Sequence, residues 1–295
     1  MTFNDDADIR GGRVSRRGRN VAIGAGLGGG GIVVVAVVLI AQLFGVDLSG
    51  VVPTTGSVPD SSATALNQCA TGAQANDDMD CRMQAAATSL DAYWADTLGS
   101  TYTQPQLALF DGATSTGCGA ATADVGPFYC PNDETVYIDT AFYDELRSRF
   151  GASGGPLAQL YVVAHEWGHH IQNITGITDG LDLRASGPTS DSVRLELQAD
   201  CLAGSWVAGA SHTTDEHGTP FLKPPTTAQV SDALNAAAAV GDDRIQSTLG
   251  SGQVDPESFT HGTSAQRDRW FSEGYDEQTG GRVQCDTFGV SGREL

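Results

Sequence analysis

The chain has few basic residues, no CxxC cysteine pair and no evident internal repeat. Its 295 residues include 16 Lys and Arg against 36 Asp and Glu, which gives a formal net charge of -20. Phosphate binding needs a basic face, so this balance argues against nucleic acid as a partner. The acidity does not identify a substrate, because an acidic, solvated surface is the simpler explanation of it.

The absence of CxxC pairs also argues against a cysteine zinc cluster. An even number of cysteines, all beyond residue 46, is typical of disulfides formed outside the cytoplasm. Several pairings are possible in principle. Closure between nearest neighbours predicts Cys69 with Cys81 and Cys118 with Cys130, which leaves Cys201 for Cys285.

A stretch without any charged side chain, residues 21–46, follows an arginine-rich start. Its length suits a helix that spans a bilayer, and the preceding arginines predict a cytoplasmic N-terminus. A cleaved signal peptide is the alternative, but the apolar run is long for one and no small-x-small site directly follows it. The arginines concerned are Arg10, Arg13, Arg16, Arg17 and Arg19.

These features predict four segments in one membrane-bound chain. Residues 1–20 form a cytoplasmic basic tail and residues 21–46 a single transmembrane anchor. Residues 47–66 are rich in Pro, Gly, Ser and Thr and predict a flexible linker. Residues 67–295 then form a domain outside the cytoplasm, at the cell membrane.

The exported part predicts more helix than strand. Apolar residues recur at helical spacing in 75–98, and a helix with an alanine-rich middle is expected at 228–249. Residues 112–123, rich in Thr and Gly, predict a loop. Residues 135–139 predict a strand. Such a strand can pair with a substrate backbone when it lies at a sheet edge, or it can be purely structural.

The strongest chemical signal is the motif His165-Glu166-x-x-His169, which follows an apolar run. In a helix the two histidines lie one turn apart on one face, so both imidazoles can bind one metal ion. Glu166 is then placed to take a proton from a water molecule. The alternative is a surface helix whose histidines are merely solvated.

A second helix, expected at residues 193–210 after an N-cap near Ser190, carries Glu196 and Asp200 on one face. A catalytic zinc needs three protein ligands and one open position. Glu196 is therefore the predicted third ligand, and Asp200 the predicted hydrogen-bond acceptor of a ligand imidazole. The alternative is a pair of solvated acids on an amphipathic helix.

Three further histidines lie after these helices. His261 follows Thr260 in a turn-like setting at an expected helix start. It can donate a hydrogen bond to a developing oxyanion, or it can serve only as a cap or surface residue. His212 and His217 are expected to be surface residues.

The combination of motifs resembles the neutral zinc metallopeptidase family of bacterial membrane proteins. The resemblance runs from about Cys118 to the end of the chain, which is most of the exported region. It implies a zincin-like α+β domain, mostly helical with a small sheet and preceded by one transmembrane helix. It also implies a gluzincin-like peptidase with one catalytic Zn²⁺. The matching stretches are residues 126–131, 136–139, 164–170, 196–201 and 259–264.

The second-helix pattern Glu196-x-x-Ala199-Asp200 is also similar to that of membrane heat-shock and prenyl-protein peptidases. In those enzymes this glutamate is the third zinc ligand, and a histidine in a Thr-His-Pro turn lies near the metal. Here Thr260-His261 matches, but Gly262 replaces the proline.

The sequence therefore predicts a membrane-anchored zinc peptidase that acts on peptides or proteins. His165, His169 and Glu196 are the predicted metal ligands, and Glu166 and His261 the predicted catalytic residues. Two alternatives stay open. One is a non-catalytic, membrane-tethered module that keeps the zinc helices as a scaffold, and the other is a zinc amidase that acts on a cell-wall amide.

Overall fold

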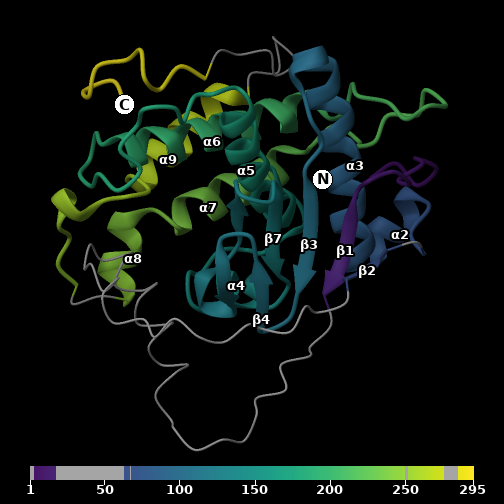
Figure 1. Ribbon diagram of the computed structural model, residues 1–295, viewed down its shortest axis with the longest axis horizontal. Helices are drawn as coiled ribbons and strands as arrows, with labels where there is room; N and C mark the ends of the chain where they lie inside the picture. The colour runs from purple at the N-terminus through teal and green to yellow at the C-terminus, as the bar shows by residue number, and fades with distance from the viewer. Residues whose placement is uncertain (1–2, 18–62, 67, 250–251, 276–284) are drawn as a thin grey trace, which may run out of the picture.

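The computed structural model describes residues 3–17, 63–66, 68–249, 252–275 and 285–295. These residues form a mixed α/β fold with eight α-helices and a small sheet (Figure 1). The prediction of a mostly helical domain with a small sheet is confirmed.

The predicted membrane anchor, residues 21–46, lies outside the described residues. Among the helices that are described, none combines the length and the apolar character that crossing a bilayer requires.

The main sheet has five strands, of which the central three are parallel and the two at its edges are antiparallel to their neighbours. All five residues of β7 are buried, as expected for a strand inside a covered parallel sheet. The predicted strand is thus confirmed, but it is internal, and the edge beside it is β6. The order is β2 (Ala63–Ala65), β1 (Val14–Arg17), β3 (Gln106–Phe110), β7 (Thr135–Asp139) and β6 (Phe128–Cys130).

The first residues of the chain belong to this fold, which differs from the predicted cytoplasmic tail at 1–20. Strand β1 pairs with β2 on one side and β3 on the other, and Phe3 and Ile9 are buried in the main core. The arginines have partners within the fold: Arg16 pairs with Asp80, and Arg17 bonds the Ser115 carbonyl. Residues 3–17 therefore belong to the same folded unit as the rest of the sheet.

Two further boundaries differ from the sequence-based expectation. The predicted linker at 47–66 ends earlier, because its last residues form β2. The predicted loop at 112–123 is a hairpin of β4 (Ala113–Thr116) and β5 (Gly119–Thr122). Its Thr-rich strands resemble a polar loop in composition, which is why pattern alone missed it.

The predicted helix at 228–249 is two helices, α7 (Thr227–Ala239) and α8 (Asp242–Leu249). The break lies at Gly241, where an added Cβ would be 2.5 Å from the Ser264 backbone nitrogen. Glycine thus allows the start of α9 (Ser264–Gly274) to approach the break.

Helix α5 is central to the fold and packs most extensively against α3, α6 and α7 and against strands β6 and β7 (Figure 1). It begins at a proline, and α6 is capped by Ser190, whose hydroxyl accepts a hydrogen bond from the Val193 amide. Gly168 of α5 lies against Ala199 of α6 so closely that an added Cβ would be 3.0 Å from the Ala199 Cα. The two helices are therefore in close contact where they carry the motif residues. Their bounds are α5 (Pro156–Ile174), α6 (Asp191–Gly209), α2 (Gly72–Asp77), α3 (Met79–Leu98), α4 (Phe142–Ser148) and α9 (Ser264–Gly274).

The predicted disulfide pairing is confirmed for all six cysteines. Cys69–Cys81 ties the chain after β2 to α3, and Cys118–Cys130 ties the β4–β5 hairpin to β6. Cys201–Cys285 ties α6 to the C-terminal segment. Each closes a loop in the unfolded chain and so stabilises the fold.

Asp91 of α3 supports the central helix through Tyr102. The Tyr102 hydroxyl donates to Asp91 and accepts a hydrogen bond of 3.1 Å from Trp167 Nε1 on α5. Burial raises the pKa of Asp91 from 3.8 to about 7, although the hydrogen bonds from Tyr102 and Gln104 oppose this.

This raised pKa predicts that the free energy of unfolding falls as the pH rises from about 4 to about 7. In that range the folded protein keeps a proton on Asp91 that the unfolded chain has lost. Each rise in pH therefore favours the unfolded chain, and Asp91 lowers the free energy of unfolding most at the alkaline end of the range. Urea unfolding at pH 4.5 and 7.5 should show a smaller difference for Asp91→Asn than for the wild type. Asp77→Asn, at an exposed position of α2, is the control, and an equal effect of both substitutions would contradict the assignment.

Candidate metal centre

Helices α5 and α6 bring the three predicted metal ligands together. The ligand atoms of His165, His169 and Glu196 all lie within 4.8 Å of one another. His165 Nε2 is 3.2 Å from Glu196 Oε2, and His169 Nε2 is 3.4 Å from Glu196 Oε1. The helical spacing of the histidines and the close contact of the two helices produce this arrangement.

Each imidazole is held at its other ring nitrogen. His165 Nδ1 lies 2.9 Å from Asp200 Oδ1, as the sequence predicts. His169 Nδ1 lies 2.9 Å from Gln172 Oε1. The Gln172 amide nitrogen donates to the Leu195 carbonyl and to Gln198, so its oxygen is the acceptor for the imidazole. Both histidines therefore carry a proton on Nδ1 and present Nε2 to Glu196.

Arg267 of α9 was not predicted and is the main partner of Asp200. Its guanidinium forms two hydrogen bonds with the Asp200 carboxylate, of 2.8 and 2.9 Å, and a third of 3.1 Å with the Tyr161 hydroxyl. Tyr161 in turn donates to Asp200. Arg267 is 2% exposed and Asp200 is fully buried. This pair fixes the carboxylate that orients His165.

The electrostatics of the cluster favour bound positive charge. Burial opposes ionisation of every member, but attraction between opposite charges is stronger. Despite burial, Asp200 and Glu196 raise the pKa of His165 to about 10. Burial alone would raise the pKa of Glu196, but the nearby histidines lower it more. The pKa of the Glu196 carboxyl therefore lies well below its usual range. Ionised carboxylates next to two imidazoles stabilise a cation at the Nε2 atoms.

Glu166 follows His165 on the same helix and is buried beside the ligands. It is 8% exposed and borders the cleft over the metal centre. Burial raises the pKa of its carboxyl, and the neighbouring imidazoles partly offset this effect. A carboxylate with a raised pKa is a better base toward water near neutral pH.

His261 borders the same cleft and is held by Asp242, which the sequence did not single out. One Asp242 oxygen accepts the backbone amides of Thr260, His261 and Gly262, and the other lies 3.3 Å from His261 Nδ1. Gly262 has φ +86 and donates its amide to Asp242. A proline could provide neither this backbone angle nor the donor, which explains the Thr-His-Gly sequence.

A cleft with a cavity volume of about 670 Å³ lies over the ligands. Its polar side contains the three ligands, Glu166, His261 and Arg267, and its other sides come from the chain before β6, from β6, and from helices α4, α7 and α8. A substrate of small-molecule or peptide size can therefore reach the ligand atoms.

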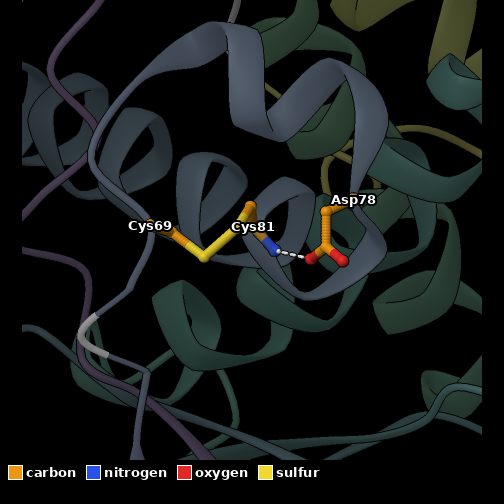
Figure 2. A group of neighbouring side chains, drawn as sticks. All are labelled: Cys69, Asp78 and Cys81. Carbon is orange, nitrogen blue, oxygen red and sulfur yellow. Dashed lines mark hydrogen bonds between the residues drawn. A yellow bond between two sulfur atoms is a disulfide. The ribbon is translucent and has the colours of Figure 1, made fainter.

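The ligand set fits a catalytic zinc ion. Two imidazole nitrogens and one carboxylate are the donors of many catalytic zinc sites, and the cleft leaves room for a fourth ligand. A second group, Cys69, Asp78 and Cys81, also lies within range of a common point in the described residues. Its two sulfur atoms form a disulfide, and Asp78 accepts the Cys81 amide as the N-cap of α3 (Figure 2). Without thiolates this group does not fit a metal.

Substitutions of Gln172 test whether its side-chain oxygen orients the His169 imidazole. Gln172→Leu is expected to weaken zinc binding about 10- to 100-fold, because His169 loses the acceptor that fixes its tautomer. Gln172→Glu keeps an acceptor at this position and should weaken binding less. Competition with a fluorescent zinc chelator measures both constants, and equal affinities in Gln172→Leu and the wild type would remove Gln172 from the site.

Comparison with known proteins gives one family and several relatives. The family model described as "Putative neutral zinc metallopeptidase" matches residues 4–288. Uncharacterized protein Rv2575 of Mycobacterium tuberculosis is 48% identical over 255 residues, which cover 85% of this chain and 86% of the relative. Uncharacterized protein YpfJ of Escherichia coli is 42% identical over 273 residues, which cover 90% and 88%. No solved structure is significantly similar to the chain.

Proposed function

Because this chain belongs to the neutral zinc metallopeptidase family, we propose that it is a gluzincin-like zinc peptidase that hydrolyses peptide bonds. The observation that carries the proposal is the convergence of His165 Nε2, His169 Nε2 and the Glu196 carboxylate at the base of an open cleft. These three residues would hold the ion. The proposal includes a zincin-like arrangement of the two motif helices.

The catalytic work is divided between the ion and the side chains around it. Bound zinc supplies a Lewis acid that lowers the pKa of a water molecule toward about 7 and stabilises negative charge on a carbonyl oxygen. Glu166 takes the proton of the attacking water at its carboxylate and delivers it to the leaving amine. Asp200 and Gln172 keep the two imidazoles in position during this transfer.

His261 is proposed to stabilise the oxyanion that forms at the scissile carbonyl. Its partners Asp242 and Thr260 both lie at Nδ1, so Nε2 is the ring nitrogen left for the cleft. Burial would lower the pKa of His261, but the nearby carboxylates of Glu196 and Asp242 raise it. The raised pKa makes the imidazolium, which carries a proton on both nitrogens and can donate from Nε2, more accessible than in a free histidine.

Location outside the cytoplasm is proposed from the three disulfides, which persist in oxidising compartments. Attachment to the cell membrane through residues 21–46 is proposed from their apolar sequence. Strand β1 shares a sheet with the catalytic domain, so we place both on the same side of that membrane. This placement is incompatible with a single crossing by residues 21–46, so the proposal is limited to attachment.

The buried carboxylate of Glu166 favours a catalyst over a non-catalytic scaffold, because a scaffold has no need of an acid beside the ligands. A cell-wall amide as substrate would use the same residues. Purified peptidoglycan fragments and a peptide library, offered to the same zinc-loaded protein, separate the two substrate classes.

The proposal is tested by metal content and peptide hydrolysis of the full-length protein. One zinc per chain is expected in the wild type, and a chelator should abolish hydrolysis that added zinc restores. His169→Ala should lose the zinc, whereas His212→Ala, at an exposed histidine, should keep it. Stoichiometric zinc in His169→Ala, or hydrolysis that survives chelation, would reject the proposal.

A further inference from the structure

The cleft has a second, apolar side that the metal chemistry does not use. The lining of the cleft includes apolar side chains from strand β6, from helices α4 and α8, from the loop after α4 and from the residue that follows α7. The ones that matter here are Phe128, Phe142, Leu146, Phe150, Val240 and Ile245.

The aromatic members of this wall are only partly buried. Phe128, Phe142 and Phe150 all retain exposed surface, although phenylalanine usually fills a core. Elsewhere in the described part of the chain, the exposed large apolar residues are Leu183 and Val254. Partly exposed rings gathered around a cavity next to reactive groups indicate a site for an apolar group.

The charged residues at this wall do not favour a charged ligand. Glu145 and Arg149 of the rim form an ion pair of 3.2 Å with each other. Arg267, on the polar side, is bound to Asp200 and Tyr161. Each of these arginines already has an anionic partner, so an acidic side chain or a terminal carboxylate would have to displace one.

Strand β6 could pair with an extended substrate peptide and so place that peptide beside this wall. It is the outermost strand of the sheet and borders the cleft. Its Tyr129 hydroxyl is held at 3.0 Å by both His170 and Asn173 of α5. The strand is thus fixed to the helix that carries the metal ligands, and a peptide paired with it would direct alternate side chains toward the cleft.

We propose that the apolar side of the cleft is a specificity pocket for one bulky aliphatic or aromatic side chain next to the cleaved bond. This inference rests on the proposed function and adds its substrate class, peptides with a large apolar residue beside the scissile bond. The occupant is the substrate itself, because the apolar wall and the ligand atoms border one continuous cavity.

The first experiment maps cleavage sites. The zinc-loaded, full-length wild type is incubated with a proteome-derived peptide library, and the products are sequenced by mass spectrometry. Leu, Ile, Phe, Met and Val are expected to dominate one position adjacent to the cut. A matched pair of peptides with Leu or Ala there should differ about 10- to 200-fold in kcat/KM, the range for apolar pockets.

The second experiment changes a pocket side chain that is not a metal ligand. The Val240 carbonyl, which accepts a hydrogen bond of 3.3 Å from Arg267, is kept in the substitution. Val240→Phe fills it and should lower kcat/KM for the Leu peptide at least about 10-fold, mainly through KM, with the Ala peptide changed less than about 3-fold. Phe150→Ala enlarges it and should shift the preference toward Trp. Val254→Phe, the same substitution at an exposed position outside the cleft, should change neither peptide.

The outcomes separate the pocket from the proposed function. Cleavage without apolar preference, or an equal loss for the Leu and Ala peptides in Val240→Phe, overturns the pocket and leaves the peptidase. Absence of cleavage of every library peptide by zinc-loaded protein rejects both. If Val240→Phe does not fold, as judged by circular dichroism, the shift expected for Phe150→Ala decides.

Discussion

Glu166→Gln is expected to reduce kcat about 10²- to 10⁴-fold, the usual contribution of a general base, while zinc stays bound at one ion per chain. The substitution keeps the size of the side chain and removes its ability to take a proton. Glu166 is not among the three clustered ligands, so the metal centre should be unaffected. KM is expected to change little, since the lost interaction acts on the transition state.

The measurement is kcat on one library-derived peptide, together with zinc content by mass spectrometry. Glu145→Gln is the matched control, because it makes the same substitution at the rim of the same cleft. It should retain turnover within a few-fold. Full activity in Glu166→Gln would show that another group, or none, takes the proton.

Arg267→Met is expected to lower both the stability of the protein and its affinity for zinc. The change leaves Asp200 buried without its main partner, and breaking a buried pair in this way costs about 3–5 kcal/mol of unfolding free energy. Zinc affinity should also fall about 10- to 100-fold, because Asp200 no longer fixes His165. Urea unfolding of the zinc-free protein isolates the first effect, and chelator competition measures the second.

The double variant Asp200→Asn/Arg267→Met separates charge from orientation. It removes the buried charge and should regain part of the lost stability, but it should not regain zinc affinity. Arg269→Met is the control. Arg269 lies on the same helix as Arg267, but it is exposed and pairs with Glu273 at 3.9 Å. Its effect should stay within about 0.5 kcal/mol, since surface pairs contribute little. A similar loss in both arginine variants would argue against a special role for Arg267.

Local patterns pointed to the metal ligands, and the family resemblance supported Glu196 beyond what its spacing gave. The i, i+4 spacing of the histidines and the spacing of Glu196 and Asp200 are properties of single helices, and the convergence of the two helices was the only long-range assumption. Disulfide pairing by nearest neighbours also succeeded, since two of the three bonds join cysteines only 12 residues apart.

The residues that were missed act across long sequence distances. Arg267 and Asp200 are 67 residues apart, and no helical or strand period relates them. Asp242 binds a turn that begins 18 residues later. Gln172, by contrast, lies three residues after His169 on the same helix, so its spacing could have identified it.

The folding of the N-terminal segment into the sheet was missed for a physical reason. Arginines before an apolar run are the usual signal of a cytoplasmic tail, and this signal takes no account of the apolar Phe3, Ile9 and Val14 in the same segment. Those side chains are buried, and that burial makes the segment part of the domain.

The position of β1 between β2 and β3 affects how the protein can be truncated. A version that starts after the apolar stretch would lack an inner strand, so β2 would lose its partner and β3 would gain an unpaired edge. Open edges of this kind promote aggregation. Deleting only the intervening stretch and joining Arg17 to Ala63 by a short turn would keep the sheet whole, since these two residues are already opposite each other in the β1–β2 ladder.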